Sequence, residues 1–166
     1  MGKNHAEAKS RLGSMLCFTV YSTAHAFNRA YKPLLDALGL TYPQYLAMFA
    51  LWEHDDLAVK ELGELLHLDS GTLTPLLKRL ERQNMVVRRR DPGDERRVIV
   101  DLTEAGRALR IRAAEVPASL ACKIALPPME LMELRDRVHR FTDHLVDDGG
   151  VPAQSCEPAL AGAARR

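Results

Sequence analysis

The sequence predicts a mainly α-helical fold that contains one β-hairpin, and three observations lead to this prediction. Leu, Ala and Val dominate the apolar residues, whereas aromatic residues make up only 5% of the 166. This composition favours helices over strands. Most of the chain carries apolar residues at intervals of three and four, the periodicity of a helix with one buried face. Residues 85–102 instead combine β-branched residues with turn-forming residues in the pattern of a hairpin.

The first two helices are predicted on either side of Gly39. A long helical pattern covers residues 10–38, and Gly39 ends it as a glycine at a helix C-terminus does. Thr41 can cap the next helix, and Pro43 is tolerated in its first turn. The apolar pattern of this second helix continues to about His54.

The middle of the chain is predicted to contain several short elements in succession. A very short strand at 57–59 is followed by two short helices joined by a tight turn and then by two strands. The helices are predicted at 60–66 and 69–83, and the strands at 85–90 and 97–102. Asp91-Pro92-Gly93-Asp94 has the residues of the turn between those strands. Helix, turn, helix and hairpin in this order predict a winged helix-turn-helix.

The helix predicted at 69–83 has one apolar and one polar face. Its leucines follow the i, i+3, i+4, i+7 spacing at Leu73, Leu76, Leu77 and Leu80. Pro75 removes a backbone hydrogen bond if the helix starts at Ser70, but not if it starts nearer Thr72. At 1.5 Å per residue the helix is about 20 Å long. It would therefore fit a DNA major groove about 12 Å wide.

Charge is concentrated near this helix. Eight cations and four anions lie between Lys78 and Arg97, a local charge of +4, although the whole chain has a net charge of only +1. A basic patch on a nearly neutral chain indicates a polyanionic partner. A solvated charged face is the alternative interpretation.

The C-terminal part is predicted to be helical again. Thr103 can cap a helix from Glu104 to about Leu120, which Pro117 would bend or split, and Cys122 follows that helix. After the two prolines 127–128 the last helix carries a short a/d seam suited to packing between subunits. The seam consists of Leu131, Leu134, Val138, Phe141 and Leu145.

These elements predict a winged helix-turn-helix with a helical dimerisation domain built from the N- and C-terminal helices. The winged DNA-binding domain would span 41–102, and residues 10–40 would form the dimerisation region together with 103–147. Residues 1–9 and 148–166 would form flexible tails. A two-fold homodimer would present two reading helices about 34 Å apart, which suits pseudo-palindromic double-stranded operator DNA.

Several function classes are unexpected from the composition. Three cysteines without a CxxC motif do not form the disulfide framework of a secreted protein. The chain begins without a signal-peptide pattern and has no apolar run of about 18 residues, so we expect a cytoplasmic protein with no membrane partner. The six histidines lack metal-ligand spacing, and neither a Gly-rich phosphate loop nor a Ser/His/Asp arrangement is present. We therefore expect no enzyme activity, no cofactor and no metal.

Cys17 lies on one face of the first predicted helix, together with Tyr21, Asn28 and Tyr31. Cys17 and Tyr31 are about 21 Å apart along that helix and cannot touch within one chain. In an antiparallel dimer, Tyr31 of one chain could approach Cys17 of the other and stabilise its thiolate. The alternative is that Cys17 is a small buried apolar residue, and spacing alone favours that interpretation.

The segment LDSGTLTPLLKRLERQNMVVRRRDPGDERRVIVDLTEAG (68–106) resembles the MarR family of bacterial winged-helix repressors. The D-x-R motif of their wing corresponds to Asp94-Glu95-Arg96. The segment MLCFTVYSTAHAFNRAYKPLLDALGLTYPQY (15–45) resembles the OhrR-type branch, which senses organic hydroperoxides. The resemblance covers roughly residues 12–145.

The resemblance implies a redox mechanism. Cys17 matches the cysteine that an organic hydroperoxide oxidises, and Tyr31 and Tyr42 match the tyrosines that reach the partner subunit's cysteine. Cys122 matches the resolving cysteine of the two-cysteine subclass, although a spare helix thiol is its alternative. The resemblance also implies that Ser70, Thr72 and Thr74 meet bases or nearby phosphates. Lys78, Arg79 and Arg88 would hold phosphates. Arg96, steadied by Asp94, would enter the minor groove.

Two alternative functions remain open. A MarR-type repressor of the same fold could be released by a phenolic or other small molecule, with Cys17 not the sensor. A thiol peroxidase is the other alternative, but no thioredoxin-like βαβ pattern surrounds Cys17.

Overall fold

The computed structural model describes residues 11–146, so the tails predicted at 1–9 and at 148–166 lie outside the described residues. The chain divides into two compact units, one that ends at Ile124 and one that begins at Ala125. The first unit contains a 3₁₀ turn η1 (Arg11–Ser14), α1 (Leu16–Asp36), α2 (Tyr42–Glu53), β1 (Leu57–Ala58), α3 (Val59–Leu66), α4 (Ser70–Arg82), β2 (Val86–Arg90), β3 (Val98–Leu102), α5 (Glu104–Ala113) and α6 (Val116–Ile124). The second contains α7 (Pro128–Val146).

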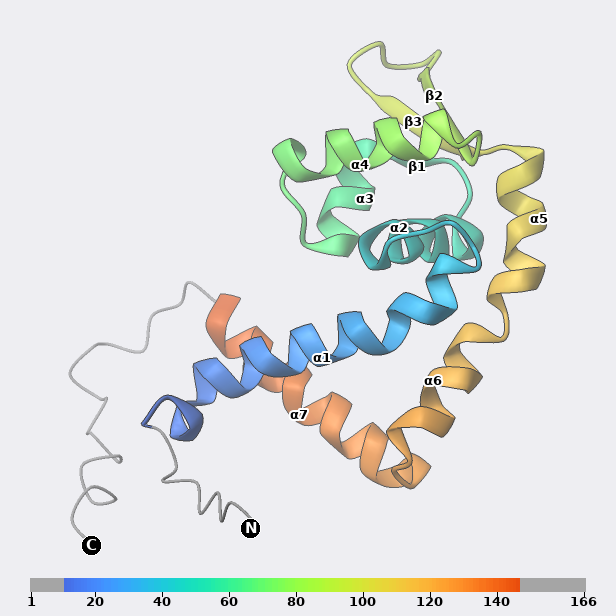
Figure 1. Ribbon diagram of the computed structural model, residues 1–166. Coiled ribbons are helices and arrows are strands. Elements are labelled where there is room, and N and C mark those ends of the chain that lie inside the picture. The colour runs from blue at the N-terminus through green and yellow to red at the C-terminus, as the bar shows by residue number, and fades with distance from the viewer. Residues whose placement is uncertain (1–10, 147–166) are drawn as a thin grey trace, which may run out of the picture. The chain divides into compact units, whose positions relative to one another are not determined.

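The predicted winged helix-turn-helix is confirmed. Three antiparallel strands form a small sheet in the order β1-β3-β2, with Leu57 opposite Val100 and Arg90 opposite Val98. Figure 1 shows β2 and β3 extending beyond α4 as a wing, while α2 and α3 lie on the other side of α4. The strand and helix boundaries agree with the predicted ones to within a residue or two in this region.

The core of the winged domain is formed around α4. Leu73, Leu77 and Leu80 are at most 1% exposed and pack with Met48 and Leu62. This is the apolar face that the leucine spacing predicted. Burying a Leu side chain contributes roughly 1.5–3 kcal/mol, so these leucines hold α4 firmly against α2 and α3.

Side-chain caps set where three helices begin. The Gln44 side chain accepts the backbone N–H of Thr41 at the start of α2. The Thr103 hydroxyl accepts the N–H of Gly106 at the start of α5. Asp69 caps α4 by accepting the Thr72 N–H, so α4 starts at Ser70. Pro75 therefore lies inside α4 and cannot donate the usual hydrogen bond to the preceding turn.

Two of the predicted helices are divided. The pattern expected as one helix over 10–38 is broken at Met15, between η1 and α1. The helix expected from Glu104 is split before Pro117, which occupies the second position of α6. Because α6 continues to Ile124, Cys122 lies within a helix instead of after one.

The second unit exposes the predicted seam. None of the α7 residues is buried within a single chain. Val138 is 50% exposed and Leu145 is 69% exposed, although both belong to the apolar stripe. Across the described residues 11–146, no helix is both long enough and apolar enough to cross a membrane.

Candidate nucleic-acid interface and redox residues

An open groove lies between α3, the first half of α4 and the wing. Its volume is about 1080 Å³, and it is lined by both polar and apolar residues. Five of the eight residues predicted to bind DNA line it: Ser70, Thr74, Arg88, Asp94 and Arg96. The fold thus gathers residues from α4, β2 and the wing turn along one surface.

The other three predicted residues lie on the exposed side of α4. The Thr72 hydroxyl already has a partner in its own helix turn, because it donates a hydrogen bond to the Asp69 carboxylate at 3.1 Å. Lys78 and Arg79 are exposed to solvent. Arg79 also lines a smaller hollow of about 570 Å³ next to the turn between α1 and α2.

Arg88 is not the free cation that the sequence suggested. Its guanidinium is paired with Glu81 at 2.6 Å, and only 27% of its side chain is exposed. The hydrogen bond from Arg88 is the main reason why the pKa of Glu81 lies below its usual value. The Nε atom of Arg88 is buried and has no hydrogen-bond partner. A phosphate would therefore meet Arg88 with a carboxylate already beside it.

The wing turn is held by its own aspartates. The Asp94 carboxylate accepts the Arg96 backbone N–H at 3.0 Å, and Asp91 accepts the Gly93 N–H at 2.9 Å. The Arg96 side chain remains exposed at the groove. Arg97 turns to α3 instead, where it pairs with Glu61 at 2.6 Å. Arg97 thus anchors the wing and leaves Arg96 as the cation at its tip.

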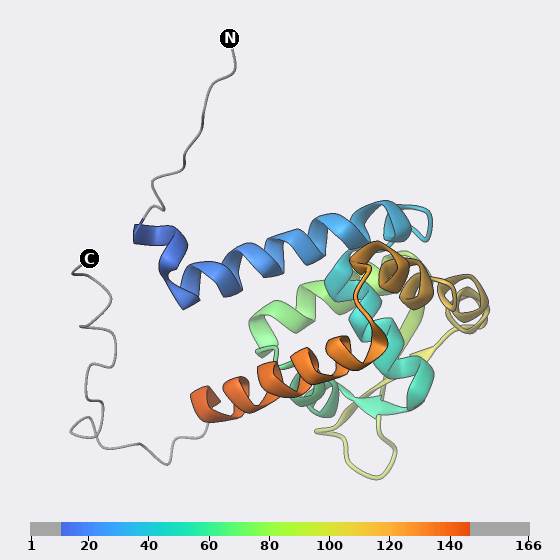
Figure 2. The same ribbon diagram turned by 90° about the horizontal axis from the view of Figure 1, so that it is seen from below.

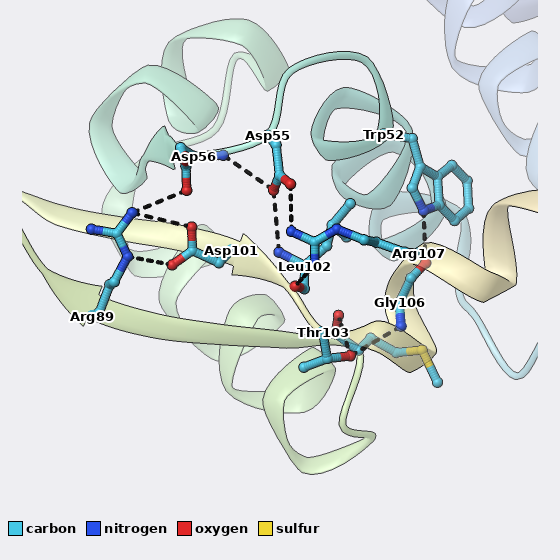
Figure 3. Close-up of polar contacts among 10 residues, drawn as sticks. Trp52, Asp55, Asp56, Arg89, Asp101, Leu102, Thr103, Gly106 and Arg107 are labelled. Carbon is cyan, nitrogen blue, oxygen red and sulfur yellow. Dashed lines mark hydrogen bonds and ion pairs between the residues drawn. The ribbon is translucent and has the colours of Figure 1, made fainter.

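A second ionic cluster, which sequence reasoning missed, joins the α2–β1 turn to the sheet and to α5 (Figure 3). Arg89 pairs with Asp101 at 2.6 Å and with Asp56 at 3.0 Å. Arg107 pairs with Asp55 at 2.5 Å and also donates to the carbonyl of Leu102.

The aspartates of this cluster have unequal surroundings. Burial raises the pKa of Asp101, whereas hydrogen bonds from Asp101 and Arg89 lower the pKa of Asp56. One carboxylate oxygen from each of Asp55, Asp56 and Asp101 lies within 4.8 Å of the others, a spacing that could hold a cation. Because two guanidinium groups already pair with all three aspartates, these residues have the character of a structural cluster.

Gly106 is enclosed on all sides at the start of α5. The indole N–H of Trp52 donates to the Gly106 carbonyl at 2.9 Å, as Figure 3 shows. A Cβ atom built on Gly106 would lie 2.1 Å from the carbonyl oxygen of Met85. This contact explains why the sequence has glycine here.

The two tyrosines predicted to act together lie together in the structure. The rings of Tyr31 on α1 and Tyr42 on α2 have centroids 4.6 Å apart, and Tyr45 lies 5.9 Å from Tyr31. Burial, followed by the proximity of Tyr42 and Tyr45, raises the pKa of Tyr31 to about 12. Burial also raises the pKa of Tyr42. Both tyrosines are therefore protonated at neutral pH and can donate hydrogen bonds.

Cys17 and Cys122 are both exposed free thiols, on α1 and α6 respectively. Within one chain Cys17 is therefore not the buried apolar residue that its spacing favoured. It lies near the N-terminal end of α1, the half that extends away from the winged domain in Figure 2. Cys156 lies outside the described residues.

The chain is similar to known transcription regulators. A family model described as transcriptional regulator SarA/Rot matches residues 29–110. The organic hydroperoxide resistance transcriptional regulator of Bacillus subtilis is 43% identical over 81% of this chain and 92% of its own length. The HTH-type transcriptional regulator TtmR of Methylorubrum extorquens is 46% identical over 87% of this chain and 74% of its own.

Solved structures of AbfR from Staphylococcus epidermidis have the same architecture. Reduced AbfR bound to DNA is 34% identical, with a TM-score of 0.69 over 82% of this chain and 94% of AbfR. A disulfide-formed AbfR structure matches with a TM-score of 0.62 and 32% identity over 88% of this chain and 100% of AbfR.

Proposed function

Because this chain belongs to the MarR/SarA family of winged-helix transcriptional regulators, which are not enzymes, we propose that it is a redox-sensing repressor. It binds operator DNA as a homodimer and is released when an organic hydroperoxide oxidises Cys17. An intersubunit disulfide between Cys17 and Cys122 then holds the released state. The observation that carries the proposal is the exposed thiol of Cys17 on the half of α1 that its own chain leaves uncovered.

The groove supports the DNA-binding part of the proposal. Hydroxyl groups at the start of α4 would meet bases or nearby phosphates, while the exposed cations of α4 would contact phosphates, which position the protein without reading sequence. Arg96 at the wing would enter the minor groove. Relatives named as transcription regulators, and AbfR solved on DNA, support the same assignment.

The exposed apolar residues support a homodimer. Leu35, on the same face of α1 as Cys17, is 1% exposed because it meets the winged domain. Tyr21, also on that face but toward the N-terminus, is 61% exposed. Leu16 is 60% exposed and Phe27 is 39% exposed. A second copy that covers this surface would also bring the partner's tyrosines toward Cys17.

The chemistry requires a thiolate and a proton donor. The Cys17 thiolate attacks the outer oxygen of the hydroperoxide, the O–O bond breaks, and the alkoxide leaves as an alcohol after taking a proton. Cys17 is thereby oxidised to a sulfenic acid. The neutral phenols of Tyr31 and Tyr42 from the other chain provide hydrogen bonds for these steps. The thiol of Cys122 then displaces water from the sulfenic acid to form the disulfide.

The disulfide would move the two winged domains out of register on the operator. Specific binding typically exceeds nonspecific binding by about 4–10 kcal/mol, and a mispositioned second domain forfeits much of this difference. Two relatives support an oxidative signal, since one is named for organic hydroperoxide resistance and AbfR has a disulfide-formed structure.

An operator gel shift before and after cumene hydroperoxide tests the proposal. Wild type should release DNA on oxidation, and Cys17→Ser should stay bound. Cys122→Ser should lose the covalent dimer band on a non-reducing gel. Retained release in Cys17→Ser, or release by a phenolic ligand without oxidant, would instead favour a ligand-controlled repressor. If cumene hydroperoxide and hydrogen peroxide oxidise Cys17 at equal rates, the result would count against a peroxide site that is apolar.

A further inference from the structure

Gln44 is the one polar side chain in the buried core of the described residues, with 4% of its surface exposed. An amide without hydrogen bonds in such a place costs several kcal/mol. Gln44 lies on α2, two residues after Tyr42. It is therefore close in sequence to the tyrosine cluster, which consists of Tyr31, Tyr42 and Tyr45. Its hydrogen bonds explain how an amide can be kept there.

The amide of Gln44 joins two helices. Its Oε1 atom accepts from the backbone N–H of Thr41 at 2.9 Å and from the Thr41 hydroxyl at 3.0 Å. Its Nε2 atom donates to Oε1 of Gln83 at 3.3 Å. Gln83 is the residue that follows the last turn of α4. The start of α2 is therefore bonded to the end of α4, 39 residues away; α4 is the recognition helix of the proposed DNA-binding domain.

Gln83 completes the connection on the other side. Its Nε2 atom donates to the carbonyl of Gly39, in the turn between α1 and α2, at 2.9 Å. Each amide uses both its donor and its acceptor, so an apolar side chain at either position removes the hydrogen bond that connects α2 to the end of α4. The hollow of about 570 Å³ beside these residues also borders Arg79 and Arg82. An open hollow therefore lies beside this end of α4.

We infer that Gln44 and Gln83 are positioning residues that couple the tyrosine cluster to the recognition helix. The inference rests on the proposed function. Tyr42 is the first residue of α2 and contacts Tyr31. Gln44, which accepts from Thr41 at the start of α2, donates to Gln83. When oxidation of Cys17 changes what Tyr31 and Tyr42 contact, the start of α2 moves. The two amides then carry this displacement to the C-terminal end of α4.

The first test compares operator affinity before and after oxidation in full-length Gln83→Met. Wild type should bind about 100-fold more weakly after oxidation, and this ratio should fall about tenfold in Gln83→Met, within the usual range of such couplings. The rate of Cys17 oxidation should stay unchanged, because Gln83 is not in the peroxide site. Gln83→Glu keeps the acceptor for Gln44 and should give a ratio closer to wild type.

Arg82→Met is the matched control. It removes a cation from the same turn of α4 and should weaken binding equally in both redox states, which leaves the ratio unchanged. An unchanged ratio in Gln83→Met would overturn the coupling, whereas a wild type that oxidation does not release would overturn the proposed function.

A second measurement does not depend on oxidation. Amide hydrogen exchange in the last turn of α4 should rise about threefold or more in reduced Tyr42→Ala. The single variant Gln83→Met should also raise this exchange rate. In the double variant, adding Tyr42→Ala to Gln83→Met should have little further effect. If Tyr42→Ala leaves exchange in α4 unchanged, the coupling does not exist, whatever the response to peroxide.

Discussion

The winged domain and the terminal helices differ in how completely one chain covers their apolar surface. In the winged domain, Leu73 and Leu77 of α4 are at most 1% exposed. In the terminal helices, Leu16 of α1 is 60% exposed and Leu145 of α7 is 69% exposed. A large exposed apolar surface usually marks an interface. The core of the winged domain is therefore complete in one chain, whereas the proposed sensor needs a second copy.

The largest expected effect concerns the winged domain, whose core is complete in one chain. Gly106→Ala places a methyl group 2.1 Å from the Met85 carbonyl oxygen, a backbone atom that cannot rotate away. We expect a loss of about 3 kcal/mol or more in the free energy of unfolding, measured by urea denaturation. Gly93→Ala is the control, since its new Cβ would lie at an ordinary 3.5 Å from Asp91. Equal stability of Gly106→Ala and wild type would contradict the tight packing.

The next effect concerns the terminal helices, whose apolar residues are exposed in one chain. Val138 on α7 is 50% exposed in one chain, so Val138→Glu should leave the winged domain folded but weaken the dimer. We expect a cost of about 2 kcal/mol, or roughly a 30-fold rise in the dimer dissociation constant. Sedimentation equilibrium measures it. Arg140→Gln lies on the opposite face of α7 and should not change dimerisation. A dimer equally tight in Val138→Glu would place the interface elsewhere.

A smaller effect tests whether the groove beside the wing binds DNA. Arg96→Ala removes the exposed cation at the wing, and we expect operator binding to weaken about tenfold, the usual cost of one such contact. Fluorescence anisotropy with labelled operator measures the affinity. Arg110→Ala removes an exposed cation of α5 that does not line the groove. If both variants bind like wild type, the wing does not contact DNA.

The smallest effect concerns pH. The pKa of Tyr31 is raised from 10.0 to about 12, first by burial and then by Tyr42 and Tyr45. The unfolded chain therefore loses this proton first, and the contribution of Tyr31 to stability is complete below pH 10. It is lost as pH rises from about 10 to about 12. Unfolding of Tyr31→Phe should show a shallower decline over this interval. Identical pH profiles would show that Tyr31 titrates normally.

The elements that the sequence predicted well have local causes. Thr41 and Thr103 precede helices and occupy cap positions in the structure. The leucine spacing of α4 fixed its buried face, and the Asp-Pro-Gly-Asp turn placed the wing. All of these signals lie within a few residues of the feature that they predict.

The pairings of charged side chains could not be predicted in the same way. Arg97 meets Glu61 across 36 residues, and Arg107 meets Asp55 across 52. Each arginine has several acidic residues at comparable distances along the chain, so only the folded backbone selects its partner. Arg88 was assigned to phosphate from its charge alone, whereas the structure places it beside Glu81. The roles assigned to individual DNA-binding and redox residues remain predictions.

The ion pairs of the winged domain also determine how strongly ionic strength should affect DNA binding. Three of the eight cations between Lys78 and Arg97 are in ion pairs among the described residues, namely Arg88, Arg89 and Arg97. The other five could displace counterions from phosphate in each of two protomers. If all of them do so, the logarithm of the binding constant should fall with the logarithm of salt concentration with a slope of about −9, not about −14 as for all eight. Binding would then tolerate salt better than the count of basic residues suggests.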